Sequence, residues 1–149
     1  MFPRLIQKKF YIRKEVIMKT LEPGVYGKVE ITVDEKVSAK RAASGEMDVF
    51  GTPYVIALME ETADKSVRPY LDEECATVGT VVNIVHKAAT PMGMKAYAES
   101  ELVEVDGRRL VFKVAVYDEA GQVAEGTHER FIIYKDKFMK KAESRGKEQ

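Results

Sequence analysis

The chain has 149 residues, and its 24 Lys and Arg balance its 24 Asp and Glu, so the net charge is zero. This length predicts one domain with a hydrophobic core, and the lack of a basic field argues against a nucleic-acid partner. No apolar run reaches the roughly 18–20 residues that span a bilayer, so no membrane partner is expected. The single Cys75 cannot form an internal disulfide, which predicts a cytoplasmic protein. With one Cys and two His we expect no metal site, although carboxylate sites stay open.

The first 17 residues form a distinct basic segment with five Lys and Arg against Glu15. This segment lacks the continuous apolar stretch of a secretory signal, so residues 1–17 are interpreted as an accessory extension without chemistry. Met18 offers an alternative start of translation. Residues 18–149 are predicted to form a single domain.

Hydrophobic alternation over residues 25–33 predicts a half-buried strand. A loop-like segment follows and leads into a predicted helix that starts at Thr52 and runs to about residue 70. Four further strands are predicted at 76–88, 94–105, 108–117 and 122–134, and the charged tail from Lys135 is predicted to be a short helix. One strand, one long helix and four antiparallel strands predict an α+β fold with the sheet wrapped round the helix.

Two local patterns refine this sheet. Asp106-Gly107 is a strong hairpin signal between the second and third of the four strands. The strand over residues 76–85 is apolar on both alternating faces, which predicts a central place in the sheet.

The predicted helix carries a carboxylate close to its apolar face. Thr52 is predicted to be the N-cap and Pro53 the first helical residue. At 100° per residue, Glu60 lies about 60° from the centre of the face that contains Ile56 and Met59. A carboxylate in that position is costly unless another group pairs with it or uses it.

Thr52, Glu60 and His86 are the candidate catalytic residues. Thr52 and Glu60 are separated by a little over two helical turns, so both can lie on one side of the helix. His86 ends the predicted strand that follows the helix. A histidine at a strand end that faces a helix with a buried acid can perform acid–base chemistry.

Seven blocks of sequence resemble the fluoroacetyl-CoA thioesterase-like branch of the hotdog-fold acyl-CoA thioesterases. They are VFGT at 49–52, LME at 58–60, RPYL at 68–71, VGT at 78–80, HKAATPMG at 86–93, VDGRRL at 105–110 and EGTHER at 125–130. The resemblance covers about residues 25–140. It implies a five-stranded antiparallel sheet wrapped round one helix, a homodimer, and active sites at the subunit interface.

The resemblance also implies roles for particular residues. A Thr, a Glu and a His act together in that family, and by motif they correspond to Thr52, Glu60 and His86. A glycine beside the bound thioester corresponds to Gly79, and an arginine of the last strand to Arg130. The chain departs from the family over residues 42–48, where enzymes selective for the fluorinated substrate carry aromatic lid residues and this chain carries none. The resemblance therefore predicts the catalytic trio without predicting fluoroacetyl-CoA selectivity.

Each of these residues also has an interpretation without catalysis. Thr52 can act as a helix cap only, and Glu60 and Arg130 can each form an ordinary ion pair. His86 can be a strand-end histidine bonded to its neighbours, and Gly79 can mark a β-bulge. His128 is interpreted as structural, and Cys75 as a packed thiol rather than a nucleophile.

We therefore expect an acyl-CoA thioesterase that hydrolyses short or small acyl-CoA thioesters without a cofactor. Glu60 would activate water or form a transient acyl-enzyme anhydride, and these two routes stay open. Two alternatives remain: a hotdog enoyl-CoA hydratase, since one scaffold hosts both chemistries, and a non-catalytic acyl-CoA-binding or regulatory module.

Overall fold

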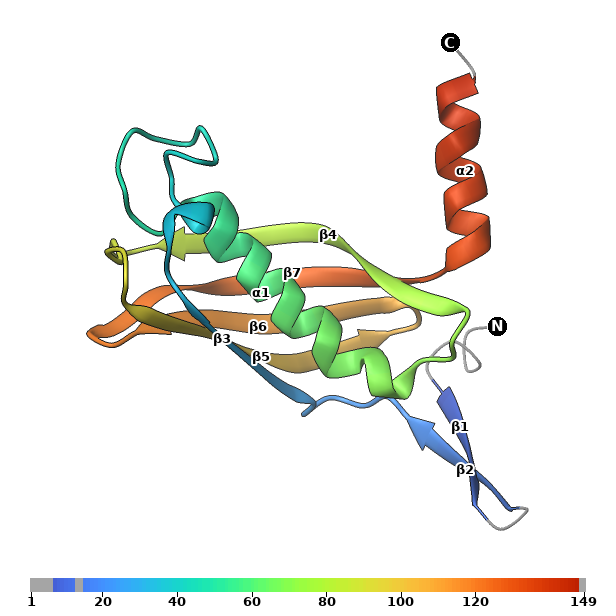
Figure 1. The fold of residues 1–149 in the computed structure, drawn as a ribbon. Coiled ribbons are helices and arrows are strands. Elements are labelled where there is room, and N and C mark those ends of the chain that lie inside the picture. The colour runs from blue at the N-terminus through green and yellow to red at the C-terminus, as the bar shows by residue number, and fades with distance from the viewer. Residues whose placement is uncertain (1–6, 13–14, 148–149) are drawn as a thin grey trace.

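One antiparallel sheet of five strands and the long helix that crosses it form the core of the computed structural model (Figure 1). Residues 7–12 and 15–147 are described. In the sheet the strand order is β3-β5-β6-β7-β4. These strands are β3 (Tyr26–Thr32), β4 (Cys75–His86), β5 (Lys95–Asp106), β6 (Arg109–Asp118) and β7 (Gly121–Tyr134). The predicted order of one strand, one helix and four strands is confirmed.

Helix α1 (Thr52–Val67) buries one face against the sheet and continues into the 3-10 turn η2 (Arg68–Tyr70), as predicted. Its buried residues recur at helical spacing and are Val55, Leu58, Met59, Thr62, Ala63 and Val67. The prediction that Thr52 caps the helix is wrong. Gly51 is the N-cap, its carbonyl accepts from the N–H groups of Tyr54 and Val55, and Thr52 is the first helical residue. Thr52 therefore leaves its hydroxyl free for another partner.

Two-residue turns join β5 to β6 and β6 to β7. Between β5 and β6 the two loop residues are Gly107 and Arg108, and Gly107 has φ of 60°. A positive φ at the first loop position is the requirement of a type II′ turn, which glycine meets without strain. The predicted hairpin at this position is therefore confirmed.

Strand β4 lies at the edge of the sheet, so the prediction that it is central is wrong for the single chain. Its only partner among the described strands is β7. Val81, Val82 and Val85 are consequently 44%, 38% and 61% exposed, on an edge that no other described strand covers. An apolar, unpaired edge is a surface that proteins normally cover.

Two further elements flank the sheet. Strands β1 (Gln7–Ile12) and β2 (Glu15–Thr20) pair as a separate hairpin, and residues 1–6 and 13–14 of the predicted extension lie outside the described part. Helix α2 (Lys135–Lys147) follows β7 where a terminal helix was predicted and points away from the sheet (Figure 1). Neither α1 nor α2 has the length and apolarity to cross a bilayer, and the described chain offers no other α-helix.

Candidate active site

Thr52 and His86 meet where the start of α1 reaches the end of β4. The Oγ1 atom of Thr52 lies 2.7 Å from the Nδ1 atom of His86. The backbone holds these two ends together, because the N–H of Phe50 donates to the carbonyl of Thr90 at 2.9 Å. The Nε2 atom of His86 is buried and has no hydrogen-bond partner among the described residues. This nitrogen is therefore a polar atom whose hydrogen-bonding capacity the described residues leave unused.

Glu60 lies further along α1, opposite β4 and β7. Its Oε2 atom accepts from Nη1 of Arg130 at 3.2 Å, and the Glu60 side chain is 40% exposed. The carboxylate is thus paired on one side and open on the other. It can accept a proton from a molecule that approaches from the open side.

Gly79 leaves the space in which the Glu60 carboxylate sits. A Cβ atom built on Gly79 would collide with Oε2 of Glu60 and would lie 3.3 Å from the His128 ring and 3.4 Å from Nη1 of Arg130. The strand is also irregular here, since its register with β7 shifts between Gly79 and Val81. The bulge that was an alternative for Gly79 is present, and so is the close approach of a functional group.

Arg130 is buried, with 6% of its surface exposed. Besides Glu60, it contacts Thr77 and Asp64. Its Nε donates to the hydroxyl of Thr77 at 2.8 Å and its Nη2 to the Thr77 carbonyl at 3.0 Å. The same Nη2 forms an ion pair with Oδ1 of Asp64 at 3.6 Å. Both carboxylates, Glu60 and Asp64, lie on α1 one turn apart and face this one guanidinium.

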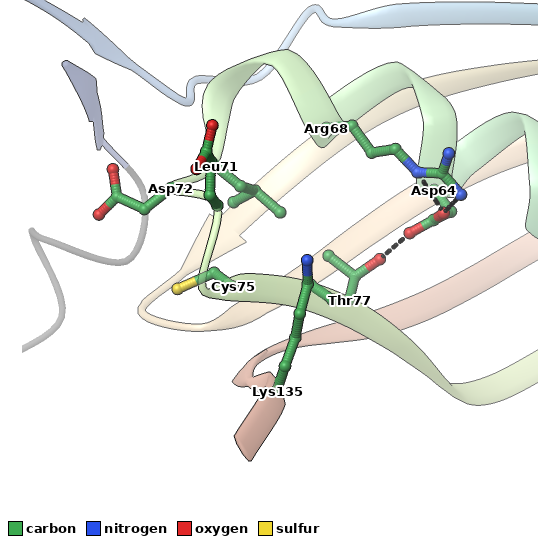
Figure 2. A pocket seen from close by; sticks show the side chains of 9 residues that line it. Asp64, Arg68, Leu71, Asp72, Cys75, Thr77 and Lys135 are labelled. Carbon is green, nitrogen blue, oxygen red and sulfur yellow. Dashed lines mark hydrogen bonds and ion pairs between the residues drawn. The ribbon is translucent and has the colours of Figure 1, made fainter. Parts of the chain in front are cut away.

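Asp64 also lines a pocket of about 400 Å³, whose wall does not include Glu60 or Arg130 (Figure 2). Figure 2 shows Asp64 bonded to Arg68 and Thr77 at its wall. Cys75 also lines this pocket and is 5% exposed, and its burial, followed by the charge of Asp72, raises the pKa of its thiol. A thiol that resists ionisation is a packed thiol, as the sequence predicted, rather than a nucleophile.

The single chain brings the predicted residues together as two groups rather than one. Thr52 and His86 form the first group, and Glu60, Gly79 and Arg130 form the second. Eight residues of helix separate Thr52 from Glu60, which is about 12 Å along the axis. Within the described part of the chain, no hydrogen bond or ion pair joins the two groups.

His128, which the sequence predicts to be structural, lies beside the second group. It is 1% exposed, and its Nε2 lies 3.2 Å from Nη1 of Arg130. Alternation along β7 could have identified it, because His128 and Arg130 share the face that carries the buried Ile132. The described residues hold no cluster of three His, Cys, Asp or Glu side chains that could bind a metal ion.

A five-stranded antiparallel sheet wrapped round a central helix is the hotdog fold, and solved thioesterases share it. A thioesterase superfamily member from Thermus thermophilus matches with a TM-score of 0.79 at 23% identity, over 89% of this chain and 100% of that one. The fluoroacetyl-CoA thioesterase FlK, in a threonine-to-alanine variant bound to fluoroacetate, matches with a TM-score of 0.79 at 29% identity, over 84% of this chain and 98% of that one. The fold class predicted from the sequence is confirmed.

Sequence comparison gives the family within that class. The family model described as fluoroacetyl-CoA-specific thioesterase matches residues 33–136. The fluoroacetyl-CoA thioesterase of Streptantibioticus cattleyicolor is 37% identical over 94 residues, which cover 63% of this chain and 68% of that protein. The chain belongs to this thioesterase family, and the resemblance found in the sequence is confirmed.

Proposed function

We propose that this protein hydrolyses short or small acyl-CoA thioesters to the free acid and coenzyme A, with no metal or cofactor. The observation that supports this most directly is the Glu60 carboxylate, whose Oε2 atom pairs with Arg130 and lies against Gly79 while the side chain is still 40% exposed. A thioester carbonyl placed over Gly79 would lie within reach of that carboxylate. A cytoplasmic location fits the free, buried Cys75.

The proposed chemistry assigns one task to each group. Glu60 removes a proton from water, whose oxygen adds to the thioester carbonyl, or it attacks the carbonyl itself to form an anhydride. The carbon–sulfur bond then breaks, and His86, in its imidazolium form, gives the departing sulfur its proton. In the first route the proton held by Glu60 returns to His86 through solvent. In the second route water hydrolyses the anhydride to the free acid and the Glu60 carboxylate, and the proton released returns to His86. Thr52 fixes the His86 ring through the 2.7 Å contact, and Gly79 and Arg130 border the space for the thioester.

The two separate groups support a homodimer in which each site uses both chains. The exposed edge of β4 includes Gly79, Val81, Val82 and Val85. Antiparallel pairing of this edge with the same edge of a second copy would bring the His86 end of each β4 beside the Gly79 part of the other. The pairing would also make β4 an inner strand of one continuous sheet, which accounts for its two apolar faces.

We propose an acyl group other than fluoroacetyl as the preferred substrate. Residues 42–48 precede α1, and six of them are exposed, with Met47 at 66%. This segment contains no aromatic ring that could close over a small fluorinated acyl group. A panel of acyl chains is therefore needed to find the substrate.

The test is thiol release from acetyl-, propionyl-, butyryl-, branched, aryl and fluoroacetyl-CoA by the wild-type protein and by Glu60→Gln. We expect turnover of at least one member, and a loss of roughly 100-fold or more in the variant, because the base or nucleophile is gone. Glu61→Gln is the matched control, since Glu61 pairs with Lys65 on the outer face of α1. No thiol release from any member by the folded wild type, with acyl-CoA still bound, would overturn the proposal.

A further inference from the structure

Each of the three guanidinium nitrogens of Arg130 has a hydrogen-bond partner within the protein. Besides its bonds to Thr77, its Nη1 contacts both Oε2 of Glu60 and Nε2 of His128, each at 3.2 Å. An arginine has five N–H groups and no acceptor, so each of these contacts uses one donated hydrogen. Nη1 has two hydrogens, and Glu60 and His128 take one each.

The hydrogen bonds of His128 fix where its own proton lies. Its Nδ1 is 2.7 Å from the carbonyl oxygen of Val81, which can only accept, so Nδ1 carries a hydrogen. Arg130 can only donate, so Nε2 must carry a lone pair. His128 is therefore the neutral imidazole with its proton on Nδ1, and its ring is stacked on Phe112 with centroids 6.3 Å apart.

A change at His128 should reach Glu60 through one nitrogen atom. If the acceptor at Nε2 is lost, one hydrogen of Nη1 is left buried without a partner, and the guanidinium gains by turning away from its present position. Glu60 has no other hydrogen-bond partner among the described residues, so its orientation depends on the same Nη1. The Glu60 side chain is 40% exposed, so the carboxylate has room to move toward solvent once that hold is released.

We propose that His128, as the neutral imidazole protonated on Nδ1, is a positioning residue that holds Arg130 and, through Arg130, sets the orientation of the Glu60 carboxylate. This proposal rests on the proposed function, since its kinetic readout is Glu60-dependent turnover. Protonation of Nε2 would reverse the effect, because it would replace an acceptor with a donor directed at a cation. The charged groups that act on the ring are Arg130 and Glu129 from β7 and Glu60 from α1.

Three substitutions at His128 distinguish the effect of the Nε2 acceptor from the effects of the ring and of the Nδ1 donor. His128→Gln can place an amide oxygen near the Nε2 position and accept from Arg130. His128→Asn can keep the donor to Val81 without reaching Arg130, and His128→Phe keeps the ring and loses both bonds. We expect kcat within about threefold of wild type for the glutamine variant and roughly 10- to 100-fold lower for the other two, with KM changed much less.

A double-mutant cycle distinguishes a positioning role from a purely structural one, because only the positioning role makes the effect of His128 on kcat depend on Arg130. His128→Asn is combined with Arg130→Gln, and kcat is compared with that of Arg130→Gln alone. If His128 acts only through Arg130, the second substitution adds no further loss. Ile132→Val is the packing control on the same strand face, and it should lower the melting temperature without lowering kcat.

Two kinetic outcomes and one spectroscopic outcome would overturn the proposal. The kinetic outcomes are a folded glutamine variant as inactive as the asparagine variant, and an additive loss in the double mutant. Nitrogen NMR of the His128 ring provides a test that needs no turnover and should show hydrogen on Nδ1 only. If the wild type releases no thiol but shows this tautomer, the proposed function is wrong, whereas the hydrogen bond from Arg130 to His128 is confirmed. The opposite tautomer would overturn the proposal for His128 itself.

Discussion

The hydroxyl of Thr52 lies 2.7 Å from Nδ1 of His86, although 34 residues separate the two in the chain. The contact exists because Gly51, rather than Thr52, caps helix α1. A threonine at the N-cap would direct its oxygen to the N–H groups of its own helix. At the first helical position the same hydroxyl points away from the helix and reaches the strand end.

This position makes the effects of Thr52 on stability and on activity separable. Thr52→Ala should leave the free energy of unfolding within about 0.5 kcal/mol of wild type, because no helix cap is lost. It should lower kcat roughly 10- to 100-fold, because the His86 ring loses the bond that orients it. Chemical denaturation and thiol-release assays measure the two effects.

Thr52→Ser is the control, since it retains the hydroxyl and should retain most of the activity. A loss of about 1 kcal/mol of stability in Thr52→Ala, with kcat unchanged, would identify Thr52 as a cap residue after all.

Gly79→Ala tests the close approach of Glu60 to strand β4. The added methyl group would collide with the Glu60 Oε2 atom, so the carboxylate must move. We expect kcat to fall roughly tenfold or more and stability to fall by about 1–3 kcal/mol from overpacking. Combining Gly79→Ala with Glu60→Ala should recover most of the lost stability, because the colliding group is gone. No recovery in the double variant would show that the methyl group strains the backbone instead.

The elements of this fold could be predicted from the sequence because each has its own local signal. Period-two alternation predicts the strands, helical spacing of Ile56 and Met59 predicts α1, and Gly107 predicts the turn between β5 and β6. The place of β4 in the sheet could not be predicted in this way. Two apolar faces indicate only that the strand is covered on both sides, and the cover can come from a second copy of the chain.

The site was predictable in part for the same reason. Motifs identified Thr52, Glu60, His86, Gly79 and Arg130 as a set, but motifs carry no distances, and the single chain separates them into two groups. His128 lies in the block at 125–130, but the resemblance assigns no role to it. Its role depends on the register of β7 against β4, which pairs Gly79 with Arg130 and is fixed by contacts far apart in the sequence.

The buried, neutral state of His128 predicts a pH dependence of stability. Burial, followed in part by the charge of Arg130, lowers the pKa of His128 below the ordinary value of 6.5, against the opposing hydrogen bond to Val81. In the unfolded chain His128 gains its proton near pH 6.5, whereas in the folded chain it does so only at lower pH. The unfolded state therefore binds more protons in that interval, and stability falls as pH falls below about 6.5.

Denaturation from pH 7.5 to 5 should show this loss in the wild type, and the slope that His128 adds is at most about 1.4 kcal/mol per pH unit. His128→Gln removes the titrating group, so its stability should change less with pH over the same range. Equal slopes for the two proteins would mean that His128 does not stay neutral in the folded state.

Mixed dimers test whether each active site uses two chains. In a dimer of one Glu60→Gln chain and one His86→Ala chain, a shared site would combine the intact Thr52 and His86 of the first chain with the intact Glu60 of the second. The other site would lack both groups. Random mixing makes half of the dimers mixed, so activity should recover to about a quarter of wild type from two nearly inactive proteins. If each chain instead supplies a complete site of its own, mixing restores nothing, although size measurements would still show dimers.

Val85→Lys is the control on the interface, because a charge at this exposed edge position should dissociate the dimer and abolish the recovery.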